Sequence, residues 1–172
     1  MLLGLNIGKN ASTPIERAAD DYLLGLAGVY PFADYITVNI SSPNTANLRA
    51  LQTDAALDNL LGSLARQRET LAQQHGKRRP LFVKIAPDLD ASAMDEIADV
   101  VRASGIEGLI VSNTTIARPA LASKHAGETG GLSGKPLFAP STTVLREMRS
   151  RLGDSVTLVG AGGIASGEDA YA

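Results

Sequence analysis

The side chains best suited to chemistry lie in the segment Val38-Asn39-Ile40-Ser41-Ser42-Pro43-Asn44-Thr45, where amides and hydroxyls directly follow an apolar run. Asn, Ser and Pro are poor choices inside a sheet or helix. At the end of a strand they offer short, stiff hydrogen-bond donors and acceptors. The segment therefore predicts a site for a small polar ligand. The alternative is an ordinary loop with Asx-turns and a helix cap.

Four other apolar runs also end in polar residues or glycines. These ends are Asn6 with the Gly8-Lys9-Asn10 that follows, Lys84, Ser112-Asn113-Thr114-Thr115, and Gly160-Ala161-Gly162-Gly163. Lys84 stands out because a lysine within Leu-Phe-Val-Lys-Ile-Ala must reach a polar cavity or be buried at high cost. A bound anion would explain Lys84. The alternative is an edge-strand lysine that opposes aggregation.

Two glycine-rich segments allow a close approach of the backbone to a ligand. Gly160-Ala161-Gly162-Gly163 precedes a helix start, so its N–H groups could hold a phosphate. It also fits the GxGxxA dinucleotide pattern through Ala165, but the acidic residue expected about 20 positions later lies beyond residue 172. Gly130-Gly131-Leu132-Ser133-Gly134 lies in a long polar connection and predicts either a mobile loop or a close backbone contact.

The composition excludes several functions. The 172 residues have a net charge of -2 and 4% aromatic residues, so we expect no nucleic-acid partner. The chain has no cysteine, its two histidines are not spaced as ligands, and no carboxylate pair occurs at the run ends, so we predict no metal site and no glycosidase chemistry. No apolar run approaches the roughly 20 residues of a membrane span, which predicts a soluble chain.

The apolar runs alternate with helical patterns, which predicts an α/β fold with parallel strands joined by right-handed crossovers. We expect strands over 2–6, 35–39, 81–85, 109–112 and 156–159. Helices are expected from a capping box at Thr13 to Gly28, over about 57–71 and 91–104, and from about Pro140. A (β/α)8 TIM barrel takes eight units and roughly 250 residues. The prediction is therefore an incomplete portion of such a barrel, with about five βα units.

Six segments, in order, make this chain resemble the dihydroorotate dehydrogenase family, and in particular its quinone-linked (class 2) branch. They are residues 4–10 (GLNIGKN), 38–45 (VNISSPNT), 83–88 (VKIAPD), 112–115 (SNTT), 130–134 (GGLSG) and 160–164 (GAGGI). The resemblance implies an FMN enzyme of pyrimidine (UMP) biosynthesis. It would oxidise (S)-dihydroorotate to orotate and pass the electrons to a quinone.

The resemblance also implies a role for each site residue. Ser42 falls where this branch has its catalytic base, whereas the other main branch has a cysteine there. A serine is a weak base, and a relay through water or a neighbouring hydroxyl is our hypothesis for its activation. The implied substrate contacts are Asn39, Asn44, Asn113 and Thr114. The implied FMN contacts are Asn6, Asn39, Lys84, Ser112, Gly134 and Gly163.

Residues 1–172 are thus expected to form the central part of one FMN-binding barrel domain. The family's N-terminal helical segment, first strands and C-terminal strand would lie outside it. That helical segment implies peripheral attachment to the cytoplasmic side of the cell membrane, and we expect the isolated fragment to be soluble and inactive. The alternatives are another FMN barrel oxidoreductase, whose cysteine base is missing here, and a non-catalytic fragment or phosphate-ligand binding barrel.

Overall fold

The computed structural model describes residues 1–45 and 47–171 and contains one five-stranded parallel sheet. Its strands are β1 (Gly4–Ile7), β2 (Tyr35–Asn39), β3 (Leu81–Ile85), β4 (Gly108–Val111) and β5 (Thr157–Gly160). Each strand pairs with the next one in the chain, in the order β1-β2-β3-β4-β5. A doubly wound sheet would reverse its strand order at a switch point. The sequential order is instead that of a (β/α) barrel, as the sequence predicted.

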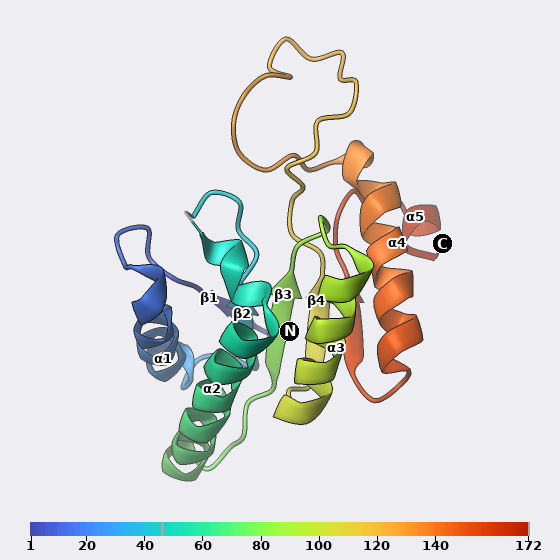
Figure 1. Cartoon of the computed structure of the whole chain (residues 1–172). Coiled ribbons are helices and arrows are strands. Elements are labelled where there is room, and N and C mark those ends of the chain that lie inside the picture. The colour runs from blue at the N-terminus through green and yellow to red at the C-terminus, as the bar shows by residue number, and fades with distance from the viewer. Residues whose placement is uncertain (46, 172) are drawn as a thin grey trace.

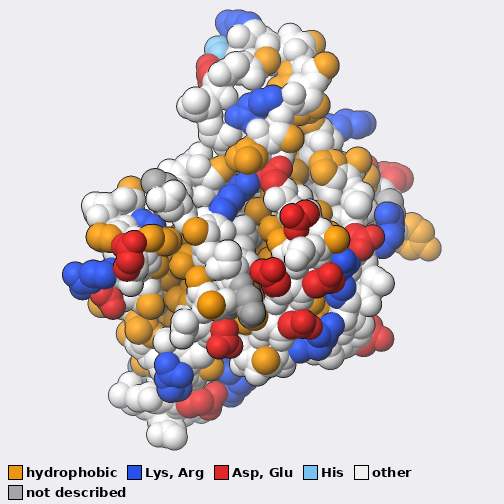
Figure 2. Space-filling model, viewed as in Figure 1, with side chains coloured by type: hydrophobic (Ala, Val, Ile, Leu, Met, Phe, Trp, Pro, Cys, Tyr) orange, Lys and Arg blue, Asp and Glu red, His pale blue; other side chains and the backbone are white. Residues whose placement is uncertain are grey.

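The long helices all cover the same face of the sheet, where they lie side by side (Figure 1). They are α1 (Ala18–Val29), α2 (Asp54–His75), α3 (Ala91–Ser104) and α4 (Lys135–Leu152). Three short elements, η1 (Ile15–Arg17), η2 (Leu48–Gln52) and α5 (Gly167–Tyr171), complete the described structure. Acidic and basic side chains are interspersed over α3 and α4 on the outer surface (Figure 2).

Burial differs between the two faces of the sheet. In β3, Leu81, Val83 and Ile85 are fully buried, whereas Phe82 and Lys84 between them are half-buried. Side chains alternate between faces along a strand, so Leu81, Val83 and Ile85 pack under the helices. Phe82 and Lys84 lie on the opposite face, which the long helices leave uncovered.

Two aromatic rings occupy the lower part of that uncovered face. Tyr35 and Phe82 pack edge to face with ring centroids 5.4 Å apart. Each ring lies against a glycine of the neighbouring strand, since an added Cβ at Gly4 would lie 2.0 Å from Tyr35 Cζ and one at Gly108 would lie 2.3 Å from Phe82 Cε1. The Tyr35 and Phe82 rings therefore fill this part of the face, and Asn39 and Lys84 lie one layer above Phe82.

Several predicted helix boundaries are wrong, and α2 extends beyond the expected 57–71 at both ends. Pro14, not Thr13, caps η1 and makes no side-chain capping bond, while α1 continues through Gly28 to Val29. The Thr13 carbonyl instead accepts a hydrogen bond from the Lys9 ammonium. Helix α4 begins at Lys135 rather than near Pro140, because Pro136 takes the early position at which a missing N–H costs little. Pro140 lies inside the helix.

The segment between β4 and α4 projects above the carboxyl ends of the strands (Figure 1). An antiparallel bridge between Thr115 and Leu132 closes its base. Above the bridge, the Arg118 guanidinium donates to the carbonyls of Glu128 (3.1 Å) and Gly130 (2.6 Å). Among the helices of the described ranges, none combines the length and apolar character needed to cross a membrane.

Candidate active site

The carboxyl ends of the strands bring the predicted polar residues to the upper edge of the uncovered face. Asn39 of β2 and Lys84 of β3 are register partners, so their side chains leave the sheet on the same side. Asn6 of β1 is paired with Thr37, which precedes Asn39 by two residues, so Asn6 lies one layer lower on the same face, and it is exposed. The sheet register therefore assembles Asn6, Asn39 and Lys84 on one surface.

A hydrogen-bond network joins the ends of β2, β3 and β4. The Asn113 side-chain amide donates to Asn39 Oδ1 (3.1 Å) and to Ser41 Oγ (3.1 Å). Ser41 Oγ in turn donates to the Lys84 carbonyl (2.7 Å). Within residues 1–45 and 47–171, the Asn39 amide nitrogen has no acceptor, so it can donate to a ligand. The network thus holds Asn39 and Asn113 as a rigid pair.

Ser42 and Asn44 lie on the turn just beyond this network. Ser42 Oγ accepts the backbone N–H of Asn44 at 3.3 Å, and no histidine or carboxylate of the described residues hydrogen-bonds to it. The Asn44 side chain is exposed. Ser42 can therefore donate its own proton outward, but the described side chains do not activate it as a base.

The glycines of the projecting segment lie directly against this turn. A Cβ added at Gly131 would lie 1.8 Å from Thr114 Oγ1 and 2.9 Å from Pro43 Cγ. One added at Gly130 would lie 3.3 Å from Asn44 Oδ1. The backbone of this segment therefore packs against the polar turn, and its predicted close contact to a ligand stays a prediction.

The second glycine-rich segment meets the start of α4. Gly163 has φ +72°, and an added Cβ would lie 2.6 Å from Phe138 N and 2.7 Å from the Gly134 carbonyl oxygen. Gly134, which precedes α4, also has a positive φ of 78°. Sequence reasoning placed a phosphate at the helix after Gly163. The helix start nearest to Gly163 is that of α4 instead, because α5 begins only at Gly167.

Ser112, which follows β4, is hydrogen-bonded to the residue that follows β5. Its backbone N–H donates to the Ala161 carbonyl (2.7 Å), and its buried hydroxyl donates to the Asn113 carbonyl (2.9 Å). The peptide bond between Val111 and Ser112 is cis. The Asn113 side-chain oxygen accepts the Thr114 N–H at 2.8 Å, which places Thr114 beside the amide pair.

Sequence reasoning missed two residues that organise this edge, Arg49 and Tyr22. Arg49 donates to the Ser41 carbonyl, to Asp88 and to the Thr114 carbonyl. The fully buried Tyr22 donates its hydroxyl to the Asn39 carbonyl at 2.6 Å, and burial raises the pKa of the Tyr22 phenol. The sequence could have indicated Arg49, because it is a cation shortly after the polar turn. It could not have indicated Tyr22, because this residue fits the apolar stripe of its helix.

Lys84 adds a positive charge to the site, beside the Arg49–Asp88 ion pair. Within the part of the chain that the structure describes, Lys84 makes no ion pair, whereas the buried Lys9 ammonium is taken up by the carbonyls of Asn10 (2.8 Å) and Thr13 (2.5 Å). The described residues hold no group of three or more His, Cys, Asp or Glu side chains that could bind a metal ion.

The parallel sheet has its strands in sequential order, is covered by helices on one face and carries polar side chains at its carboxyl ends. These features define a portion of a (β/α) barrel. A family model described as dihydroorotate dehydrogenase matches residues 1–172. The chain is 61% identical to the dihydroorotate dehydrogenase (quinone) of Leptothrix cholodnii, over 98% of this chain and 49% of that protein. It is likewise 61% identical to that of Delftia acidovorans, over 99% and 49%.

Solved structures give the same result. A ligand-free dihydroorotate dehydrogenase from Eimeria tenella is 45% identical, with a TM-score of 0.91 over 99% of this chain and 50% of that one. A ferulenol complex from the same organism is 43% identical, again with a TM-score of 0.91. This chain belongs to the dihydroorotate dehydrogenase family. It has the fold of these TIM-barrel enzymes and spans about half the length of the curated relatives it matches.

Proposed function

We propose that the protein carrying this chain oxidises (S)-dihydroorotate to orotate with FMN as its cofactor, in pyrimidine (UMP) biosynthesis. The observation that carries this proposal is the Asn39–Ser41–Asn113 network at adjacent strand ends, with Lys84 in register beside Asn39. Such paired amides present donors and acceptors in fixed directions, as recognition of a planar ring with imide-like edges requires.

In this proposal the substrate lies over the amide pair. Asn39 and Asn113 bind the pyrimidine ring, and Asn44 and Thr114 complete the contacts to the ring and its carboxylate. The Asn39 amide nitrogen, which has no acceptor within the described ranges, is the donor turned toward the ligand. Gly130 and Gly131 cover this region from above, which supports exclusion of water from it.

Ser42 is the proposed catalytic base. It takes the proton from C5 while a hydride leaves C6, so the electrons of the C5–H bond form the new C5=C6 double bond of orotate. FMN, when bound, supplies the hydride acceptor. Since no carboxylate or histidine of the described residues contacts Ser42, its activation requires a relay through water or another hydroxyl.

The chain's own residues fit FMN. Gly134 and Gly163 both have positive φ and lie together at the start of α4, whose first backbone N–H groups are suited to hold a phosphate. On the uncovered face, Lys84 makes no ion pair with the residues that the structure describes, and its charge would favour a flavin that becomes anionic on reduction. Asn6 and Asn39 would bind the polar edge of that flavin. Ser112 would contribute from the end of β4.

The proposal extends to the whole protein. Residues 1–172 are part of one FMN-binding barrel domain, and the electrons pass to a quinone. The protein lies peripherally on the cytoplasmic side of the cell membrane. Support for the quinone comes from the relatives, which are called dihydroorotate dehydrogenase (quinone), and from a serine at position 42.

The proposal is tested on the full-length protein with Ser42→Ala, beside Ser92→Ala as a matched control on the exposed side of α3. Loss of a general base lowers kcat by about 10²- to 10⁴-fold. We expect that loss for Ser42→Ala, with unchanged flavin absorbance, and no loss for Ser92→Ala. Dihydroorotate oxidation by Ser42→Ala at the wild-type rate would refute the base. A colourless parent protein that binds inorganic phosphate without oxidising dihydroorotate would instead support the binding-barrel alternative.

A further inference from the structure

The Arg49 guanidinium contacts three strand-end loops at once. In η2, its Nε donates to the Ser41 carbonyl (3.1 Å) after β2, and its Nη1 donates to Asp88 Oδ2 (2.8 Å) after β3. Its Nη2 donates to the Thr114 carbonyl (2.9 Å) after β4. A planar guanidinium presents donors in several fixed directions, whereas a lysine ammonium cannot reproduce this fork. Arg49 therefore sets the spacing of three loops.

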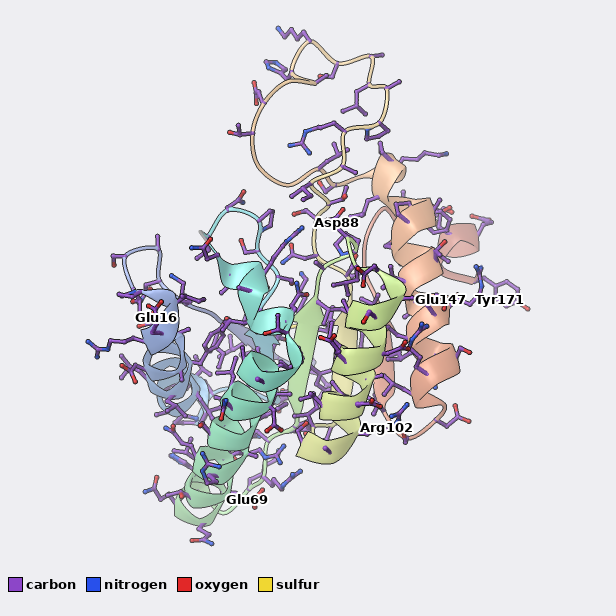
Figure 3. The ribbon with its side chains drawn as sticks, in the orientation of Figure 1. Glu16, Glu69, Asp88, Arg102, Glu147 and Tyr171 are labelled. Carbon is purple, nitrogen blue, oxygen red and sulfur yellow. The ribbon has the colours of Figure 1, made fainter. Side chains whose placement is uncertain are left out.

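Asp88 extends this contact to the base of the projecting segment. Its Oδ1 accepts the Thr115 hydroxyl, and its Oδ2 also accepts the Ile116 N–H at 3.1 Å. Thr115 in turn pairs with Leu132 through two backbone hydrogen bonds of 3.0 and 2.8 Å. Figure 3 shows Asp88 at the upper end of β3, below the projecting segment. A continuous set of polar contacts thus joins the Ser41 carbonyl to that segment.

The two carbonyls that accept from Arg49 belong to residues next to the proposed base and to a proposed substrate-binding residue. Ser41 precedes the base Ser42, and Thr114 follows the ring-binding Asn113. The Arg49 and Asp88 side chains are 21% and 20% exposed, and each Arg49 nitrogen bonds to a different loop, so the contact fixes the relative positions of these loops. The consequence of the contact is therefore mainly geometric: it relates the position of the base to that of the substrate ring.

We propose that Arg49, held by Asp88, is a positioning residue for proton removal by Ser42. The inference rests on the proposed function, because it requires dihydroorotate oxidation with Ser42 as the base. Arg49 acts through the loops that it contacts: three of its five N–H groups donate to the Ser41 carbonyl, the Asp88 carboxylate and the Thr114 carbonyl. Its effect is on the distance between the Ser42 hydroxyl and the C5 hydrogen.

The test compares Arg49→Lys and Asp88→Asn with Arg151→Lys in the full-length holoenzyme. Arg151 is a matched control because its side chain is 17% exposed and bonds to Asp95 and Glu147, on the outer side of α3 and α4. Figure 3 shows Glu147 on α4, away from Asp88. The measurements are kcat, KM, FMN content, and the kinetic isotope effect with dihydroorotate deuterated at C5.

Misplacing a reacting group by about 1 Å costs roughly 100-fold in rate. We expect Arg49→Lys and Asp88→Asn to lower kcat by about 10- to 100-fold, with KM and FMN content little changed and with a larger C5 isotope effect. The double variant should be no worse than the poorer single variant, because both changes break one network. Arg151→Lys should match the parent enzyme in every measurement.

Two results would overturn the inference while the proposed function stands. One is an Arg49→Lys enzyme with the parent's kcat and isotope effect. The other is a loss of activity that only follows the loss of FMN, with an unchanged isotope effect in the remaining holoenzyme, which is the behaviour of a merely structural residue. A parent enzyme that does not oxidise dihydroorotate would reject the proposed function, and the inference with it.

Discussion

Replacing Tyr22 with Phe removes one hydrogen bond between the helix layer and the site. The Tyr22 hydroxyl donates to the Asn39 carbonyl at 2.6 Å, and the side chain is fully buried. Phe keeps the ring and its packing. The change therefore removes only the hydroxyl donor and leaves the Asn39 carbonyl without that hydrogen bond. A hydrogen bond of this kind contributes about 1 kcal/mol, and an unpaired buried acceptor raises the cost of its loss to about 1–2 kcal/mol.

The measurement is equilibrium unfolding in urea. With m about 2–3 kcal/mol/M, the midpoint should fall by roughly 0.5 M. Tyr35→Phe is the matched control, because the Tyr35 ring packs against Phe82 while its hydroxyl has no hydrogen bond among the described residues. We expect the control to stay within about 0.5 kcal/mol of the wild type. Equal midpoints for Tyr22→Phe and wild type would refute the assignment of this bond.

The same variant has a distinct dependence on pH. Burial raises the pKa of the Tyr22 phenol well above its usual value of 10.0. The unfolded chain therefore ionises Tyr22 near pH 10 while the folded protein keeps it neutral. Its stabilising contribution is full below pH 10 and is lost as the pH rises further. The stability difference between wild type and Tyr22→Phe should shrink above pH 10, and a difference that stays constant to pH 11 would contradict this reasoning.

Two further substitutions test the site. Lys84→Met removes a half-buried cation that makes no ion pair among the described residues. We expect the free energy of unfolding of the FMN-free protein to stay the same or to rise by about 1 kcal/mol. We also expect kcat to fall about 10²- to 10³-fold and the flavin absorbance to drop. A kcat equal to that of the parent would contradict the role of this charge. Gly131→Ala places a methyl group 1.8 Å from Thr114 Oγ1, so it should destabilise by about 1–3 kcal/mol in urea and raise KM. Gly127→Ala, where nothing lies within 4 Å of an added Cβ, is its control, and equal effects of the two would show that the contact is unimportant.

The sequence predicted correctly those elements and segments that are set by residues adjacent in the chain. The run Leu81–Ile85 is a strand because its apolar residues are adjacent, and α3 ends where predicted because Gly105 follows it with a positive φ of 65°. The order of the six site segments likewise identified the family before any geometry was known. In contrast, the start of α4 was misplaced, because Pro136 and Pro140 are equivalent as local signals and only packing distinguishes them.

Tertiary structure alone decided which polar groups meet. The bond from Asn113 to Asn39 joins residues 74 positions apart, and Arg49 reaches Asp88 and Thr114 across 39 and 65 positions. Nothing in the local sequence sets these distances. They follow from the parallel register of β2, β3 and β4, which brings the carboxyl ends of the strands to one edge. The sequence thus determined the chemistry available on this chain, while the sheet determined which side chains act together.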